Sequence, residues 1–265
     1  MSPAERLLLS VTSAQWVEMT GEQRAVVFDA IHEVVPGRLL LASVVGHEPQ
    51  PFPFFIDQET QFGCYLVFGQ RFVMGATEAA IQLEVQVRER ASYDDEWADH
   101  GAADGWYVAP EHEVDVAPFF AGESELSDPL WVKLGVTRKP GLPLPANALA
   151  ALAPRGLRLP AEAELELLRI LAGHSGLVRL DSGLCADDWH RDYNGAPPRG
   201  LPWGSSNGLR RVHDVWRGPG TMVVREPAKD LKHVRPFSSL FPEAVGYCDE
   251  AVAARAAEPA LRSKR

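Results

Sequence analysis

The feature that most constrains this chain is a proline followed directly by an acidic and apolar segment, residues 160–171. Proline fits the first turn of a helix, where its missing N–H would have no partner. Leucines recur behind it at helical spacing and form an apolar stripe, while the acidic residues gather near the helix start. The pattern predicts a helix that begins near Ala161. Taken alone, it is typical of an ordinary surface helix.

A second helix is predicted over residues 20–34. Thr20 and Gln23 have the spacing of a capping box, and apolar residues from Val26 onward recur at helical spacing until Pro36. A shorter helix capped by Ser13 is expected just before it. We also expect a short helix over residues 147–153, a surface helix over 79–90, a terminal helix over 250–258, and strands at 39–45, 54–56, 64–68 and 72–74.

Composition describes an ordinary globular chain and excludes some partners. Lys and Arg number 26 against 36 Asp and Glu, a net charge of −10, which disfavours binding to nucleic acid or to an anionic membrane. The three cysteines are far apart and form no C-x-x-C pair, so neither a disulfide framework nor a zinc knuckle is expected. The N-terminus has no signal-peptide pattern, and no apolar run approaches the roughly 20 residues of a membrane span. We therefore expect a cytoplasmic protein.

Several segments carry a resemblance to one known family. Residues 158–166, RLPAEAELE, are similar to the R-L-P-T-E-A-E-W-E signature of the formylglycine-generating enzyme family, also called sulfatase-modifying factors. An F-x-M-G segment at 72–75 and a P-x-H-x-V-x-V segment at 110–116 precede it in the family's order. A C-A-D-D-W segment at 185–189 follows it. The chain resembles a divergent member of that family over roughly residues 54–240.

The resemblance implies a fold class and a division of the chain. The fold implied is α+β, the irregular C-type-lectin-like fold of the formylglycine-generating enzyme family, loop-rich with small antiparallel sheets. Residues 1–50 would form an N-terminal extension of helices and a strand, residues 51–245 the family domain, and residues 246–265 a C-terminal helix with a basic tail. The counts of 22 glycines and 21 prolines agree with a loop-rich chain.

The chain departs from the family at two places in the signature. Ala161 stands where the family has threonine, so it cannot form the T-x-x-E capping box with Glu164, a loss of about 1 kcal/mol. Leu165 stands where the family has tryptophan.

The chemistry that the family implies lacks its ligands in this chain. Family enzymes oxidise a substrate cysteine with a copper ion held by two cysteines, since soft thiolates hold copper(I). The matching stretch, residues 221–237, contains no cysteine, and Cys248 is a lone thiol beyond it. Related sulfoxide synthases use iron held by three histidines, but His32 and His47 have no H-x-x-x-H-x-E neighbours. Neither copper nor iron is expected, and no cofactor is predicted.

Two groups of residues are candidates for a site. The carboxylates of Asp187, Asp188 and Asp192 carry the hard oxygens that suit calcium, although a solvated acidic loop is the simpler interpretation. Aromatic, histidine and arginine residues also gather near the C-terminal part, and such sets occur both in cores and in binding surfaces, so both interpretations stay open. The candidate binding residues are Trp189, His190, Tyr193, Trp203, Trp216 and Arg217.

These observations favour a non-catalytic domain that binds a small ligand or another protein, or serves as a structural module. The alternative is an oxygen-dependent oxidoreductase of the sulfatase-modifying-factor class with a different metal site. The absence of the copper-binding cysteine pair and of the histidine triad weighs against catalysis.

Overall fold

The computed structural model describes the larger part of the chain. The described residues are 1–35, 37, 39–43, 52–58, 61–77, 79, 82, 110–124, 126–136, 148–172, 182–188, 190, 192–204, 210–218, 220–227 and 237–239. The expected helix over residues 250–258 lies outside them, as does nearly all of the one expected over 79–90.

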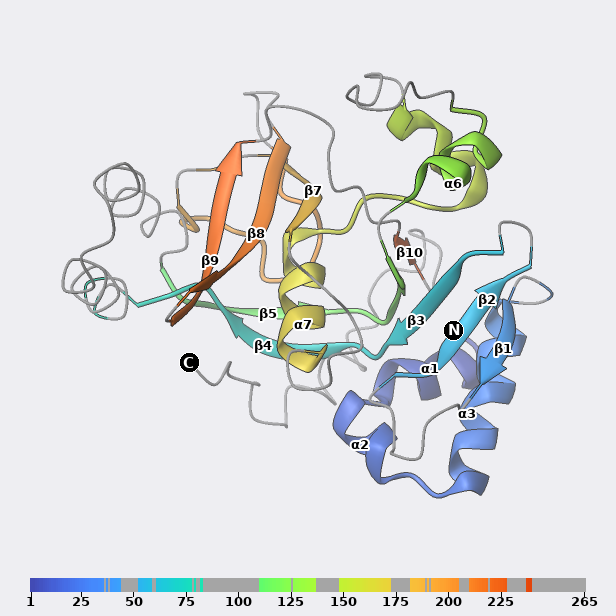
Figure 1. Cartoon of the computed structure of the whole chain (residues 1–265). Coiled ribbons are helices and arrows are strands. Elements are labelled where there is room, and N and C mark those ends of the chain that lie inside the picture. The colour runs from blue at the N-terminus through green and yellow to red at the C-terminus, as the bar shows by residue number, and fades with distance from the viewer. Residues whose placement is uncertain are drawn as a thin grey trace.

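Short helices and strands alternate irregularly along the chain (Figure 1). The helices are α1 (Pro3–Ser10), α2 (Ser13–Glu18), α3 (Gly21–Val34), α6 (Asp128–Lys133) and α7 (Glu162–Ala172), with the 3-10 helices η2 (Ala148–Ala151) and η3 (Ala153–Arg155). The strands are β1 (Leu39–Ser43), β2 (Phe54–Asp57), β3 (Gly63–Val67), β4 (Gln70–Met74), β5 (His112–Val116), β6 (Phe119–Gly122), β7 (Ser182–Asp188), β8 (Arg210–Gly218), β9 (Gly220–Pro227) and β10 (Phe237–Ser239). For β1, β8, β9, β10 and the first two residues of β7, the backbone alone is described.

The described strands form three antiparallel sheets. One sheet has five strands in the order β1-β2-β3-β6-β10, one pairs β4 with β5, and one has the order β7-β8-β9. The described part of the chain is thus a mixed α+β structure with small antiparallel sheets, which confirms that much of the sequence prediction. Strand β1, from the expected extension, pairs with β2 of the expected family domain.

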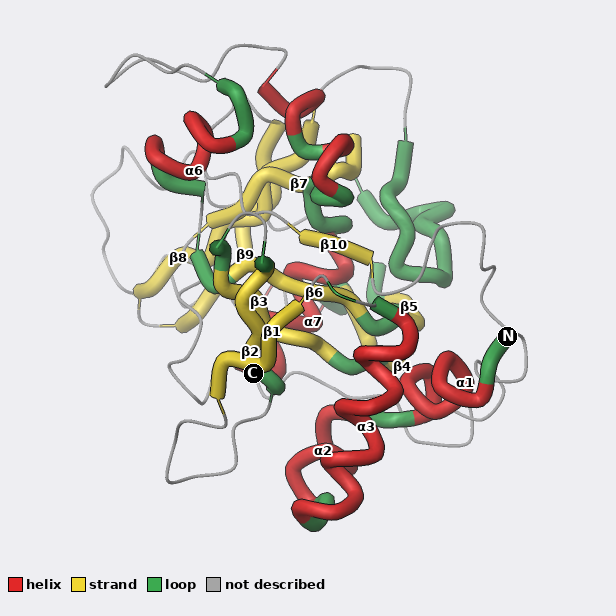
Figure 2. Tube along the Cα trace, turned by 90° about the vertical axis from the view of Figure 1, so that its right-hand side faces the viewer, coloured by secondary structure: helices red, strands yellow, loops and turns green. Residues whose placement is uncertain are grey.

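The five-stranded sheet is covered on both faces. In β3, Cys64 and Leu66 belong to the core shared with α1, α2 and α3, whereas Tyr65 and Val67 belong to the core shared with α7. Side chains that alternate along a strand point to opposite faces of its sheet. The N-terminal helices therefore pack on one face of this sheet, and the other face looks toward α7 (Figure 2).

The N-terminal helices all begin with capping boxes. In α3, Thr20 and Gln23 form the box that the sequence predicts. In α2 the expectation that Ser13 is the cap is wrong by one residue, because the hydroxyl of Thr12 accepts from the backbone of Gln15. Helix α1 is not among the sequence predictions, although Ser2 and Glu5 also form a box.

Two other local expectations differ from the structure. Val26, placed in the apolar stripe of α3, is 58% exposed, while the neighbouring Val27 is buried. Residues 147–153 were expected to form one short α-helix, but η2 and η3 are 3-10 helices. Pro154 has no N–H to donate, so a regular α-helical hydrogen-bond pattern cannot continue through it.

Trp16 joins the N-terminal helices to the sheet. Its ring lies 5.4 Å from that of Phe28 in α3 and 5.4 Å from that of Phe68, just after β3. The guanidinium of Arg24 lies 5.1 Å from the centre of the same ring. Only 3% of Trp16 is exposed, so one side chain holds α2, α3 and the sheet together.

Helix α7 lies in the interior. It contacts β4, β5, β7 and β8 (Figure 1). Its three glutamates, Glu162, Glu164 and Glu166, are only 3%, 4% and 7% exposed. The surface-helix interpretation of this segment is therefore wrong. Buried carboxylates are tolerated only with partners, and that of Glu166 pairs with Arg169 at 2.6 Å.

None of the helices in the described residues is both long enough and apolar enough to cross a membrane.

Replacing Trp16 with alanine should lower the free energy of unfolding by about 3 to 5 kcal/mol, because the change empties a fully packed site. The adjacent Val17 is 37% exposed, and Val17→Ala should change stability by less than about 0.5 kcal/mol. Urea unfolding followed by circular dichroism measures both. Equal effects of the two substitutions would contradict the role assigned to Trp16.

Candidate functional site

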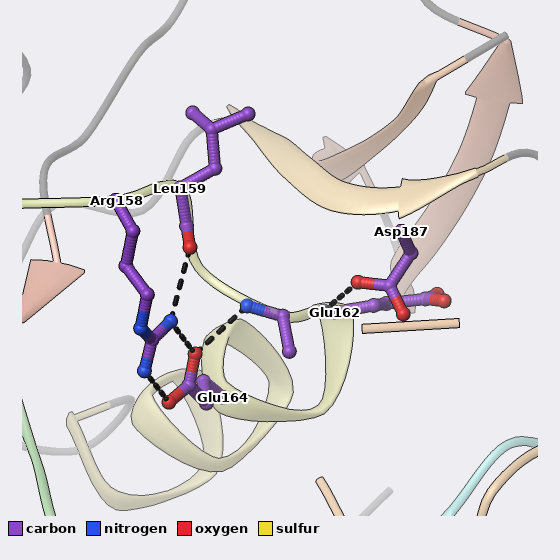
Figure 3. A network of polar contacts seen from close by, with 6 residues as sticks. Arg158, Leu159, Glu162, Glu164 and Asp187 are labelled. Carbon is purple, nitrogen blue, oxygen red and sulfur yellow. Dashed lines mark hydrogen bonds and ion pairs between the residues drawn. The ribbon is translucent and has the colours of Figure 1, made fainter. Parts of the chain in front are cut away.

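The start of α7 is held by Glu164, the third residue of the helix (Figure 3). Its carboxylate accepts the backbone N–H of Ala161 at 2.8 Å and two N–H groups of Arg158 at 2.6 and 2.7 Å. Ala161 lacks the hydroxyl of a full capping box, as the sequence indicates. The half of the box that Glu164 supplies is nevertheless present, so the position of the helix start is fixed.

Asp187 ties the end of β7 to this helix start. One oxygen of its carboxylate accepts the backbone N–H of Glu162 at 2.6 Å (Figure 3). The other oxygen accepts the backbone N–H of Trp203 at 2.9 Å. The first turn of a helix has N–H groups without helical partners and carries partial positive charge. The buried carboxylate of Asp187 satisfies one such N–H and thereby joins three segments that are distant in sequence.

Glu162 and Tyr193 form a second buried link. The Tyr193 hydroxyl donates to the Glu162 carboxylate at 2.6 Å, and both residues are only 3% exposed. The ring of His112, at the start of β5, lies 4.8 Å from the ring of Tyr193. An acid, a phenol and an imidazole from three different elements thus meet beside the N-terminus of α7.

The segment 192–204 runs along β5 and is fixed there by its backbone. The N–H of Asp115 donates to the carbonyl of Pro198 at 2.9 Å, and the N–H of Gly200 donates to the carbonyl of Asp115 at 2.8 Å. A Cβ at Gly200 would lie 2.6 Å from a methyl group of Val116. Because β5 approaches so closely, only glycine fits at this position.

His190 and Trp203 stack flat on each other, with 3.6 Å between the ring centres and 6° between the ring planes. The His190 Nε2 atom also lies 3.2 Å from the carbonyl oxygen of Trp203. The backbone of Trp203 is held on both sides, since its N–H donates to Asp187 and its carbonyl accepts from the N–H of Asp188 at 2.9 Å. The indole is therefore fixed in place.

A pocket lies among these residues. Its polar lining consists of His112, Glu162, Asp187, Tyr193 and Arg199, and its apolar lining includes Met74, Val114, Leu201 and Trp203. Its cavity volume is about 20 Å³. A cavity needs roughly 10 to 15 Å³ to hold one water molecule. The space suits one water-sized group.

Burial lowers the pKa of His112 below its ordinary value. The carbonyl of Pro110 and the negative charge of Glu162 act in the opposite direction and offset part of this effect. Since an ordinary histidine titrates near pH 6.5, His112 is mainly neutral at pH 7.

The structure brings together some of the residues predicted from the sequence. Tyr193, Trp203 and Asp187 line the pocket, and His190 stacks on Trp203. Trp189 lies outside the described residues. The backbones of Trp216 and Arg217 belong to β8, where side chains are not described, so their predicted role stays a prediction.

Of the three aspartates predicted to bind calcium, Asp187 and Asp188 both contact the backbone of Trp203, whereas Asp192 lies in a local turn. Asp187 holds two backbone N–H groups, and Asp192 accepts the N–H of Asn194 at 2.9 Å in a local turn. Among the residues that the structure describes, no three His, Cys, Asp or Glu side chains are arranged to hold a metal ion. Calcium binding stays a prediction.

Sequence reasoning did not select His112, Glu162 or Arg199 for the site. The sequence contained one indication for His112. Side chains two residues apart on a strand lie on the same face, so His112 shares a face with the apolar Val114 and Val116. A histidine on the buried face of a strand needs a polar partner, which makes it a candidate. No sequence pattern places positions 112, 162 and 199 side by side.

Comparison with known proteins finds no family model, no curated protein and no solved structure that matches this chain.

Asp187→Asn should lower the free energy of unfolding by about 2 to 3 kcal/mol, because the new amide group would face a backbone N–H in place of an acceptor. Asp192→Asn is the matched control, since asparagine supports the same local turn and should cost less than about 0.5 kcal/mol. Urea titrations of the two variants and the unchanged protein give the comparison. Equal stabilities would show that Asp187 does not hold the junction.

Lowering the pH should destabilise the protein through His112. Because its folded pKa lies below the ordinary value, the unfolded chain binds more protons from about pH 6.5 down to the folded pKa. The free energy of unfolding should fall across that window, and the fall should be smaller in His112→Gln. Histidine NMR titration checks the cause directly, and a folded pKa above 6.5 would overturn it.

Proposed function

We propose that this protein is a divergent, non-catalytic member of the formylglycine-generating enzyme family that acts as a binding module, with the pocket beside α7 as its binding site. The order of the motifs along the chain supports the family assignment. The small antiparallel sheets around one interior helix are compatible with the C-type-lectin-like fold that the family implies. The proposal places the protein in the cytoplasm.

The main support for the proposal is the pair of hydrogen bonds that the Asp187 carboxylate accepts. Both of its oxygens accept backbone N–H groups, so this carboxylate builds the pocket. The carboxylate of Glu164 likewise holds Arg158 and the N–H of Ala161. A site whose walls are fixed in advance loses little entropy when a ligand binds, which favours recognition.

The positions of two cysteines add support. Cys64 lies in the core on one face of the five-stranded sheet, and Cys185 lies in the core on the other face. These two thiols therefore cannot be the pair that copper(I) requires. The alternative, an oxygen-dependent oxidoreductase, would need a different set of metal ligands.

The test combines a ligand screen with metal analysis of the full-length protein. Compounds from a small-molecule library and from a peptide library should raise the melting temperature by several degrees, because binding stabilises the folded state. Ala196→Leu narrows the pocket and should abolish these shifts, while Ala25→Leu adds the same bulk at an exposed position of α3 and should retain them.

Metal analysis and oxygen uptake with thiol substrates separate the two functions. Stoichiometric copper or iron together with oxygen consumption would overturn the binding-module proposal. A screen in which no compound depends on the pocket would overturn the assignment of the binding site.

A further inference from the structure

We propose that the pocket beside α7 holds one ordered water molecule, and that a hydroxyl group of the ligand takes the place of this water. The water follows from the size and the polar lining of the pocket. The hydroxyl group rests on the proposed function, since it names the ligand chemistry of the same site.

The size of the cavity sets the first limit. Its volume is about 20 Å³, and roughly 10 to 15 Å³ is enough to hold one water molecule. The space therefore fits a single water molecule, or one group of that size at the end of a ligand.

The lining supplies hydrogen-bond acceptors from three elements. The carboxylate of Glu162 belongs to α7, the hydroxyl of Tyr193 to the segment 192–204, and the imidazole of His112 to β5. The Tyr193 hydroxyl donates its hydrogen to Glu162, and its oxygen keeps lone pairs that accept a further hydrogen bond. A carboxylate oxygen with one donor can likewise accept a second. An ordered water needs about two to four polar partners, and these groups can provide them.

His112 presents an acceptor because of its tautomer. Its Nδ1 atom donates to the carbonyl oxygen of Pro110 at 3.4 Å, since a carbonyl oxygen only accepts. Burial lowers the pKa of His112, so the ring is mainly neutral at pH 7. In this neutral tautomer the Nε2 atom carries a lone pair and no hydrogen.

An uncharged group suits the surroundings of the cavity. Groups of the protein already donate to both buried carboxylates, the Tyr193 hydroxyl to Glu162 and two backbone N–H groups to Asp187. Water is neutral, so it can lie here whatever other groups contact these carboxylates. The site therefore does not require a charged ligand.

The ligand chemistry follows from the water. Affinity is lost when an ordered water is displaced by a group that cannot reproduce its hydrogen bonds. A hydroxyl group is about as large as a water molecule and both donates and accepts, whereas a methyl group does neither. We therefore expect the pocket to favour a ligand that ends in a hydroxyl group.

The first test is a crystal structure of the full-length protein at a resolution that shows individual water molecules. We expect one water in the cavity, within hydrogen-bond distance of at least two of the three acceptors, which are Glu162, Tyr193 and the Nε2 atom of His112. A cavity without water, or one filled by a side chain of the protein, would overturn the inference.

A matched pair of substitutions at Ala196 tests the ligand group. Ala196 lines the pocket, and threonine and valine have the same shape but differ by a hydroxyl in place of a methyl group. Ala196→Val should melt about 2 to 4 °C below Ala196→Thr, because its methyl group displaces the water without replacing the hydrogen bonds. Equal melting temperatures of the two variants would overturn the hydroxyl assignment.

The same pair at Ala25 is the control. Ala25 is exposed on α3, and threonine and valine have similar helix propensities. Ala25→Val and Ala25→Thr should therefore melt within about 1 °C of each other. A difference as large as that at Ala196 would show that the effect does not come from the pocket, and would overturn the hydroxyl assignment.

A methanol soak of crystals of the unchanged protein covers the case in which neither Ala196 variant folds. The methanol oxygen at the position of the water supports the hydroxyl assignment. The methyl group at that position, or no methanol in the pocket, overturns it.

The outcomes also separate this inference from the function on which it rests. If library compounds bind the unchanged protein but not Ala196→Leu, and the cavity holds no water, this inference alone fails. If the water is present and no library compound depends on the pocket, the water stands, and the binding site and its hydroxyl ligand fail together.

Discussion

The carboxylate of Asp187 is the contact on which the site depends. It lies where the end of β7, the start of α7 and the segment 192–204 meet, and each oxygen accepts a backbone N–H. Backbone N–H groups buried without an acceptor cost about 1 to 3 kcal/mol each. One side chain thus removes two such costs and sets the distance between a helix and a loop. The pocket takes its shape from that spacing.

Local patterns predicted α2, α3, β1–β4 and α7, whereas α1, α6 and β5–β10 were not among these predictions. The box of Thr20 and Gln23 predicted α3, and Pro160 predicted the start of α7, because caps and prolines act within a few residues. The same reasoning applied to Ser2, Pro3 and Glu5 would have found α1. What local pattern could not supply was the setting of α7. In the sequence, its glutamates resemble a row that faces solvent. They can be buried only because other groups pair with their carboxylates.

The candidate site was predicted only in part, because local patterns do not show which distant segments come into contact. Tyr193 and Trp203 stand close together in the chain, so an aromatic cluster was visible in the sequence. Their partners His112 and Glu162 come from other elements, and the contacts follow from how β5 and α7 are placed around each other. The sequence could offer Asp187 as a metal ligand, but its role in the structure is to hold backbone.

The residues that line the pocket are distant in sequence, and this determines when the pocket can form during folding. Its walls come from β4, β5, the start of α7, the end of β7 and the segment that follows. Closing the long loops between them costs entropy that is recovered only when all the stretches have docked. The complete pocket lining is therefore expected only in the fully folded chain. A bound ligand would therefore stabilise the whole fold and slow its global unfolding. Its effect would not be limited to making one loop more rigid.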